Sequence, residues 1–434
     1  LLAVVLTESL QTVILLIGAI SITLIGLYHA GGWSGVAAHV APVKLTILRS
    51  ADDPAGLPWY SVFLGYPVIG LWYWCADQTI VQRVLGAKDE NHARVGPLFA
   101  GFIKILPVFI FVFPGTIMLA LLHQGKVPAL PALRVAADQA VPADLSPTEQ
   151  QVYQAIAKYD GQEKDIRVDY VVEQTGLPAQ EVSRSMTSLV ERKVLKAKSD
   201  AVYAHMILEL LPAGMRGILA AALLAALMST VSGALNSIAT LFSYDLYRRW
   251  RPQTPDRKLV VVGRVATFFA MVVAILWSPL IARFESIYQG ANTIICYIAP
   301  PITTVFLWGV FWRRASSRGA MATLTLGSFL GLVVFLLDWY KAFTGWNVQF
   351  MMAAFYLFVI CSIVLVVTSL IWPHQHTAQS ERLVWNHPLT ALREAGWSGI
   401  LNYRWMAGLL FVLMVLLYVV FSTEATQRFF GLVH

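Results

Sequence analysis

Ser229 and Thr230 are adjacent hydroxyl residues inside an otherwise apolar stretch of the sequence. Small hard cations such as sodium favour oxygen ligands, and hydroxyls together with free backbone carbonyls suit reversible binding. A helix also uses such hydroxyls in two ordinary ways, by bonding to the carbonyl one turn earlier or by packing against a neighbouring helix. From the residue types alone, a cation site and a structural role both stay open.

Lys104 is a second unusual residue, because it lies several residues inside an apolar segment. A cation at membrane depth costs about 2.5 to 3.5 kcal/mol on insertion scales, and such residues mark substrate or ion pathways. The alternative is that its long side chain reaches the nearby polar interface, as lysine side chains do. As a hydrogen-bond donor, Lys104 would suit a neutral solute that carries hydroxyl groups.

Residues 71–83 read Leu-Trp-Tyr-Trp-Cys-Ala-Asp-Gln-Thr-Ile-Val-Gln-Arg and end an apolar segment that Gly65, Pro67 and Gly70 interrupt. A helix opened at membrane depth leaves N–H and carbonyl groups that need protein or a water-filled cavity as partners. Broken helices of this kind form transporter substrate sites. Aromatic rings stack on the C–H faces of sugars, which fits the same chemistry. An ordinary aromatic helix end at the membrane interface is the alternative.

The elements that would position these residues are long apolar segments. Charged residues make up 13% of the chain, against about 25% in soluble domains, and apolar residues make up 57%. Nine stretches are long enough to cross about 30 Å of hydrocarbon, which predicts an all-α polytopic membrane protein. They lie at about 3–29, 58–76, 97–122, 207–243, 259–281, 286–312, 319–339, 350–372 and 404–421.

The basic residues predict the orientation of the chain. Arginine and lysine gather in alternate loops, whereas the other short loops hold few. By the positive-inside rule the basic loops are cytoplasmic, so residue 1 is at the inner face and the C-terminus is outside. The basic loops are 83–94, 248–258, 313–318 and 382–393.

Residues 144–203 are a polar stretch in the long loop between the third and fourth apolar segments. Ser146 and Glu149 form a capping box, and we expect three short helices followed by a two-stranded hairpin within 196–203. This order resembles a winged-helix domain, and the predicted orientation puts it outside. Residues 144–200 hold eight Lys and Arg against ten Asp and Glu, a net charge of −2, so DNA binding is not expected.

Several motifs occur in the order seen in one transporter family. The string at 71–83 resembles the end of the sixth core helix in the sodium/glucose cotransporter branch of the sodium:solute symporter family. The resemblance implies a LeuT-type inverted-repeat fold, here partial, with an added small winged-helix-like α+β insert. Further matches, to the fifth, seventh, eighth and tenth core helices, lie at 7–13, 102–107, 211–237 and 297–314.

The resemblance divides the chain into three parts. Residues 1–123 correspond to core helices five to seven, residues 144–203 are an extracytoplasmic insert, and residues 204–434 correspond to core helices eight to ten and three more. The family's opening helices, which supply several sodium-coordinating carbonyls, have no counterpart. Because the first residue is also Leu1 rather than Met, we expect a fragment.

The resemblance also implies an ion site. Ser229 and Thr230 match the family's paired hydroxyl ligands of sodium, and Ala226 matches its carbonyl ligand. Glu8 and Ser232 match positions of a possible second ion in some relatives, although glutamate replaces the usual aspartate.

For the solute, Lys104 matches a hydrogen-bond donor to sugar, Tyr73 matches the ring that closes the inner gate, and Trp74 is its neighbour. Asn292 stands where relatives have glutamine, and Gly70 where they have asparagine or threonine. The first replacement shortens a polar side chain and the second removes one. We therefore expect a different or larger sugar than glucose, or a related polyol.

The expected function is sodium-coupled symport of a sugar or sugar-like polyol by alternating access. Two alternatives stay open: sodium-coupled uptake of a carboxylate or amino acid, and a transporter-derived membrane sensor. The sequence has no nucleophile constellation, P-loop or metal motif. We expect no enzymatic activity, no cofactor beyond Na+ as coupling ion, no other metal and no nucleic-acid partner. The expected location is a multi-pass position in a lipid bilayer, the cell (inner) membrane for a bacterial source.

Overall fold

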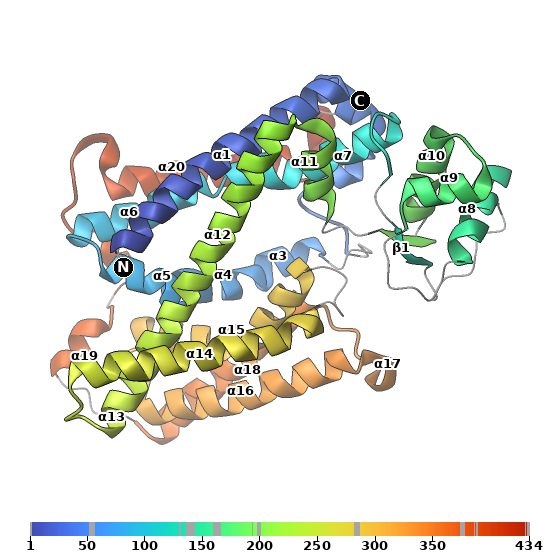
Figure 1. Cartoon of the computed structure of the whole chain (residues 1–434). Coiled ribbons are helices and arrows are strands. Elements are labelled where there is room, and N and C mark those ends of the chain that lie inside the picture. Colours follow the sequence, from blue (N-terminus) through green and yellow to red (C-terminus); the bar gives the residue numbers. More distant parts are fainter. Residues whose placement is uncertain are drawn as a thin grey trace. The chain divides into compact units, whose positions relative to one another are not determined.

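The chain forms two compact units (Figure 1). Unit 1 comprises Leu1–Thr46, Ile103–Thr230 and Thr423–His434, and unit 2 comprises Ile47–Phe102 and Val231–Ser422. The structure is a computed structural model, and it describes residues 2–51, 57–129, 132–135, 144–158, 166–192, 194–197, 201–281, 287–373, 378–385, 387, 389–429 and 431.

Unit 1 is held by an aliphatic core between long apolar helices. Ile22, Ile117, Leu121 and Met206 are fully buried in it, and α1 lies beside α7 (Figure 1). The elements of this part are α1 (Leu2–Ala30), α2 (Gly32–His39), η1 (Pro42–Leu45), η2 (Val108–Val112), α7 (Phe113–His123), α11 (Val202–Leu210), the first part of α12 (Ala213–Thr240) and α21 (Glu424–Phe429).

The polar insert in unit 1 has its own core. Val152, Val171, Val182 and Leu189 are fully buried there, and the core also draws on Ala129. Figure 1 shows the three helices gathered beside a short antiparallel sheet of β1 and β2. The elements are β1 (Ala132–Val135), α8 (Pro147–Ala157), α9 (Val168–Thr175), α10 (Ala179–Glu191) and β2 (Leu195–Ala197).

The expected capping box is confirmed. Ser146 Oγ accepts from the Glu149 N–H at 3.2 Å, and the Ser146 N–H donates to Glu149 Oε2 at 2.9 Å. The expected hairpin within 196–203 is wrong, because β2 pairs with β1, which precedes the helices. Val202 already begins α11, whose residue Met206 packs in the core of unit 1.

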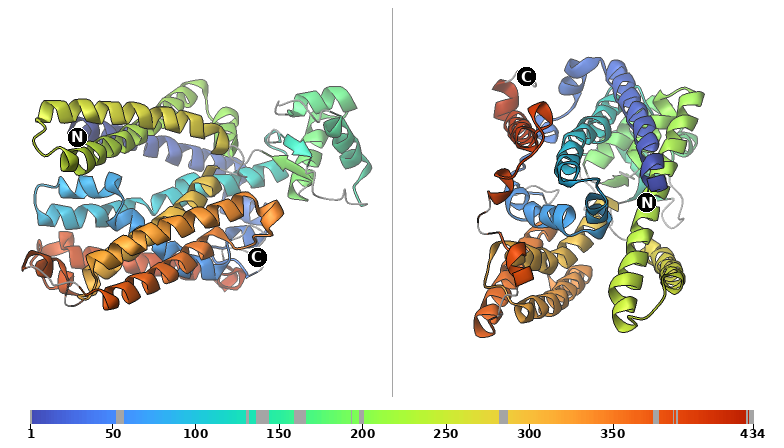
Figure 2. Two further views of the ribbon diagram at one scale, coloured as in Figure 1. Left: turned by 90° about the horizontal axis from the view of Figure 1, so that it is seen from below. Right: turned by 90° about the vertical axis from the view of Figure 1, so that its left-hand side faces the viewer.

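Unit 2 contains a bundle in which α15, α16 and α18 pack against one another (Figure 2). A Cβ added to Gly331 would lie 2.2 Å from Tyr297 O, so the absence of a side chain lets α16 approach α15 closely. The elements of this unit are α3 (Trp59–Leu64), α4 (Tyr66–Cys75), α5 (Gln78–Leu85), α6 (Glu90–Ile103), η4 (Leu241–Tyr247), α13 (Arg248–Trp250), α14 (Asp256–Ile281), α15 (Ile287–Phe311), α16 (Ser317–Trp339), α17 (Lys341–Thr344), α18 (Phe350–Ile371), α19 (Ala378–Leu383), η5 (Thr390–Leu392), η6 (Gly399–Leu401) and α20 (Tyr403–Val420).

Eight helical stretches in the described residues are long and apolar enough to span a membrane. Two expectations change in detail. The segment at 58–76 forms the short helices α3 and α4, and the segment at 207–243 divides at Leu211 and Pro212 into α11 and α12. The eight stretches are Ser9–Ala30, Glu90–His123, Ala213–Trp250, Asp256–Leu280, Ile287–Phe311, Ser317–Trp339, Phe350–Ile371 and Tyr403–Val420.

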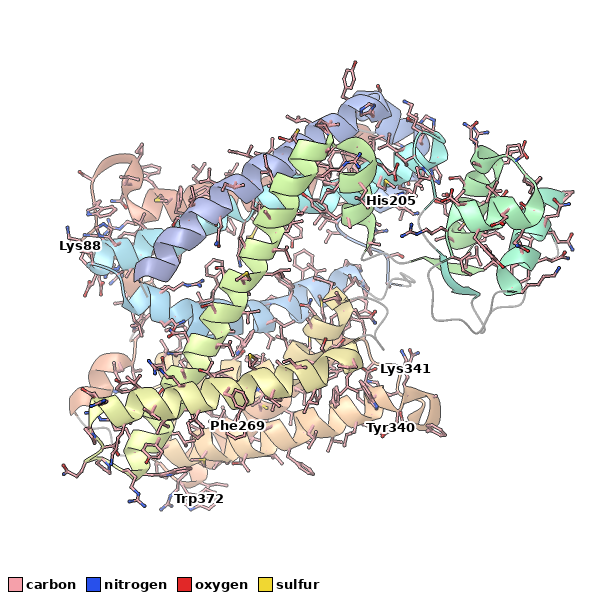
Figure 3. The ribbon with its side chains drawn as sticks, in the orientation of Figure 1. Lys88, His205, Phe269, Tyr340, Lys341 and Trp372 are labelled. Carbon is pink, nitrogen blue, oxygen red and sulfur yellow. The ribbon has the colours of Figure 1, made fainter. Side chains whose placement is uncertain are left out.

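Large apolar side chains are exposed along these helices, as a lipid environment requires. On α14 they include Phe268, Phe269 and Leu276, each more than half exposed. Figure 3 labels Phe269 on this helix, and it labels Lys88 and Lys341 at opposite sides of unit 2. Lys88 lies in the loop at 83–94 that was expected inside, and the orientation stays a prediction.

Candidate solute and ion site

The segment at 58–76 has a one-residue interruption at Gly65 and a break at Ala76 and Asp77. The interruptions expected at Pro67 and Gly70 are wrong, because α4 continues from Tyr66 to Cys75. At Gly65 the backbone stays in the right-handed helical region, so the interruption between α3 and α4 is only one residue long. A Cβ at this position would lie 2.1 Å from Met351 O of α18, which explains the need for glycine. The full break comes later, at Ala76 and Asp77, where both N–H groups donate to Trp72 O.

The break lies directly after the aromatic string. Asp77 Oδ1 accepts from the Thr79 N–H at 2.7 Å and so caps the start of α5. One turn before it, the rings of Tyr73 and Trp74 meet edge to face, with centroids 5.5 Å apart. Both side chains are half-buried. The aromatic pair therefore sits at the end of a helix whose continuation changes direction.

The other predicted solute residues in unit 2 lie on two neighbouring helices. Gly70 is on α4, and apart from its chain neighbours and the backbone of its own helix, no described atom lies within 4 Å of where its Cβ would be. Asn292 is on α15, which packs against α4, and its Nδ2 donates to Tyr288 O at 2.8 Å. The side chain of Asn292 is thus turned back on its own helix.

Thr303 joins these two helices and was not predicted. Its buried hydroxyl lies 3.0 Å from Val68 O of α4 and 3.1 Å from Ala299 O of its own helix. Pro300 and Pro301, which lack N–H groups, precede it in α15. A hydroxyl just after two prolines in an apolar helix is the signal that would have singled it out.

Lys104 lies at a helix irregularity in unit 1. α6 ends at Ile103, a turn follows, and the π-helical segment η2 begins at Val108. Thr23 Oγ1 of α1 lies 3.5 Å from Ile110 O in that segment. Such π-helical segments are common at functional sites. Lys104 belongs to a different unit from Gly70, Tyr73, Trp74 and Asn292, so its grouping with them stays a prediction.

The predicted sodium ligands lie on α12. Thr230 Oγ1 donates to Ala226 O at 3.0 Å, which is the ordinary back-bonded arrangement, and it also brings two predicted ligand oxygens together. Ser229 and Ala226 are half-buried and Thr230 is exposed. The helix is continuous from Ala213 to Thr240, so its carbonyls are engaged along the helix.

The residues of the possible second ion are placed only in part. Ser232 is exposed on α12, and Glu8 lies in α1 with its side chain outside the described residues. Across the described ranges, no group of three or more His, Cys, Asp and Glu side chains gathers.

Long apolar helices and an interrupted helix that carries aromatic side chains define the class as polytopic α-helical membrane proteins. The sequence model of the "Sodium:solute symporter family" matches residues 1–153 and 176–327. The chain belongs to this family. The matched residues omit 154–175, which lie in the insert and include α9.

Three relatives illustrate the similarity. The chain is 32% identical to sodium/myo-inositol cotransporter 2 of Sus scrofa over 355 residues, 77% of this chain and 44% of the relative. It is 28% identical to a sodium/mannose cotransporter of Bos taurus over 412 residues, 88% and 60% respectively. It is 31% identical to sodium/glucose cotransporter 4 of Danio rerio over 357 residues, 77% and 46%. The chain spans about half the length of the curated relatives it matches.

Proposed function

We propose that the protein couples inward sodium movement to uptake of a sugar or sugar-like polyol by alternating access. The observation that carries this proposal is the helix α4, separated from α3 at Gly65 and broken at Asp77, with Tyr73 and Trp74 at its broken end. Broken helices at membrane depth are where transporters bind solutes. The names of the three relatives pair sodium with myo-inositol, mannose or glucose, which are all uncharged polyhydroxylated molecules.

Individual roles follow as part of this proposal. In the ion site, Ala226 would offer a carbonyl oxygen, and Ser229 and Thr230 would offer hydroxyl oxygens. Glu8 and Ser232 are candidates for a second ion. The solute would contact Gly70, Trp74, Lys104 and Asn292, and Tyr73 would close the inner gate. The open space beside Gly70 would leave room for a solute bulkier than glucose.

The same proposal covers the fold and location. We infer a partial LeuT-type arrangement in residues 1–123 and 204–434, in the cell membrane and, for a bacterial source, the inner membrane. The insert at 144–203 would be a winged-helix-like domain on the outside that binds no nucleic acid. The three helices, which lie between β1 and β2 in the sequence, support the winged-helix-like fold. The net charge of −2 over residues 144–200 supports the absence of nucleic-acid binding.

Uptake into proteoliposomes tests the transport activity. An inward sodium gradient should raise the initial uptake of radiolabelled myo-inositol, mannose or glucose several-fold over an equal potassium gradient. Uptake of none of the three would overturn the proposed solute class. Sodium-driven uptake of an amino acid or a carboxylate instead would favour the alternative symporter.

Cysteine labelling tests the orientation. With Cys75 replaced by serine, Asp169→Cys in the insert should react with an impermeant maleimide on intact cells. Lys88→Cys, at an exposed position expected inside, should react only after permeabilisation. Reversed labelling of the two positions would overturn the proposed orientation and would revive a sensor with its insert inside.

A further inference from the structure

Side chains on one face of helix α5 contact α12 within unit 2. Thr79, Gln82 and Arg83 share this face, because residues three and four apart lie on one side of a helix. A Cβ added to Gly233 of α12 would lie 3.1 Å from a guanidinium nitrogen of Arg83 and 3.6 Å from Thr79 Cγ2. The absence of a side chain at Gly233 therefore leaves room beside α12 for the side chains of Arg83 and Thr79.

A partly buried hydrogen bond joins the two helices. Gln82 Nε2 donates to Ser237 Oγ at 2.9 Å, and Ser237 Oγ donates to Gly233 O at 3.0 Å. Ser237 is only 4% exposed. Its hydroxyl uses its one hydrogen on its own helix and accepts from Gln82, so the contact is directional. Loss of the acceptor would leave part of the Gln82 amide without its partner.

The contact connects two features of the proposed site along the chain. Ala226, Thr230, Gly233 and Ser237 follow one another at helical spacing on a single face of α12, so Ser237 lies two turns beyond the proposed sodium ligand Thr230. At the other side, α5 begins at the Asp77 cap, directly after the aromatic pair.

We propose that Gln82 and Ser237 are positioning residues that hold α5 against α12 and thereby link sodium occupancy to solute affinity. The inference rests on the proposed symport, and it names where the two sites are coupled. Neither residue touches ion or solute. A sodium ion that orders α12 would also fix the broken end of α4 through this bond, and by linkage the solute would raise sodium affinity by the same factor.

The test measures the sodium dependence of solute binding in the purified protein. The coupling factor is the ratio of the myo-inositol dissociation constant without sodium to that in saturating sodium. Ser237→Ala and Gln82→Met should each lower this factor by about threefold or more, and the double variant should lower it no further than either single one. Ser237→Thr, which keeps the hydroxyl, should restore most of the coupling.

Thr240→Val is the matched control. Thr240 also lies on α12 and bonds to its own helix, at 2.9 Å from Asn236 O, so removing its hydroxyl should leave the coupling factor unchanged. Unchanged coupling in Ser237→Ala, or additive losses in the double variant, would overturn the proposal. A loss of equal size in Thr240→Val would do the same.

A stability measurement distinguishes a failure of this positioning role from a failure of the proposed symport. The melting temperatures of the wild type, the two single variants and the double variant form a cycle that needs no transport activity. If the wild type binds no polyol in a sodium-dependent way, the proposed function fails and the linkage fails with it. A non-additive melting cycle would then still support the helix-positioning contact, and an additive one would refute it.

Discussion

Glu191 Oε1, at the end of α10, lies 3.0 Å from Nε2 of His123, the last residue of α7. The same carboxylate oxygen lies 3.5 Å from Lys44 Nζ of η1. The Glu191–His123 contact lacks hydrogen-bond geometry, so it is ionic and depends on protonation of the imidazole. Glu191 thus ties the insert to two other segments of unit 1.

Glu191→Gln should loosen the attachment of the insert. Since all three side chains are between a quarter and half exposed, each pair is worth about 0.2 to 1 kcal/mol. Amide hydrogen exchange at the ends of α7 and α10 should therefore rise roughly two- to fivefold, and high salt should have the same effect on the wild type. Glu181→Gln, on the same helix, should leave exchange at these ends unchanged. Equal exchange in the Glu191 variant and the wild type would refute the docking role.

The insert should also lose stability in acid through Glu149. Burial raises the pKa of this carboxyl, but hydrogen bonds from Ser188 at 2.5 Å and from Ser146 outweigh burial and lower its pKa below the ordinary 4.5. A lowered folded pKa stabilises the insert above the unfolded pKa, and this stabilisation is lost as the pH falls through the folded value. Exchange in α8, corrected for intrinsic rates, should therefore rise as the pH falls from about 4.5. Glu149→Gln should remove this pH dependence; if it persists in that variant, another group is responsible.

Two glycines of the interrupted segment should respond oppositely to alanine. Gly65→Ala places a Cβ 2.1 Å from Met351 O, so α3, α4 and α18 must separate, at a cost of about 1 to 3 kcal/mol. Gly70→Ala meets no described atom within 4 Å beyond its chain neighbours and its own helix backbone, and it improves helix propensity by up to about 1 kcal/mol. The melting temperature of the purified protein should fall in the first variant and hold or rise in the second. A similar fall in both variants would contradict the close approach at Gly65.

Local signals explain what the sequence could predict. Ser146 and Glu149 are three residues apart, so their capping box is readable from residue types alone. Hydropathy likewise predicted the long apolar helices, because a span needs about 20 consecutive apolar residues whatever its neighbours are. The interruption at Gly65 was expected for the same reason, since glycine interrupts a helix locally, but the interruptions expected at Pro67 and Gly70 are absent because both residues lie within α4.

Partners distant in the sequence explain the rest. Gln82 and Ser237 are 155 positions apart, and neither residue type reveals the other. The hairpin was misplaced because β2 takes its partner from before the three helices, whereas the sequence suggested the nearest residues after it. Asn292 was expected to face solute, and this stays a prediction; its amide also bonds to Tyr288 O, a local contact that polar side chains allow in any helix.

Ser229 and Thr230 should determine sodium affinity. In the variant with both residues changed to alanine, the sodium concentration for half-maximal uptake should rise roughly tenfold, because two oxygens that contact a charged ion are lost. Thr267→Val is the control, since Thr267 bonds to Gly263 O of α14 at 2.9 Å much as Thr230 bonds to Ala226 O. Unchanged sodium dependence in the double variant would show that the hydroxyls serve only the helix.

Lys104 and Tyr73 should affect the solute rather than the ion. Lys104→Ala removes a charged donor, and the solute hydroxyl it serves would lose about 1.5 to 3 kcal/mol of binding, a rise of roughly tenfold or more in the half-saturating polyol concentration. Tyr73→Phe keeps the ring that meets Trp74 and should transport nearly as well as the wild type, whereas Tyr73→Ala should leak solute. Uptake and efflux of labelled myo-inositol from the same proteoliposomes measure both effects.

Lys104→Met tests the alternative role of Lys104, because a side chain that only reaches the interface could be replaced by an apolar one without weakening solute binding. Equal half-saturation in the wild type and Lys104→Met would remove Lys104 from the solute site, and equal efflux in Tyr73→Phe and Tyr73→Ala would remove Tyr73 from the gate.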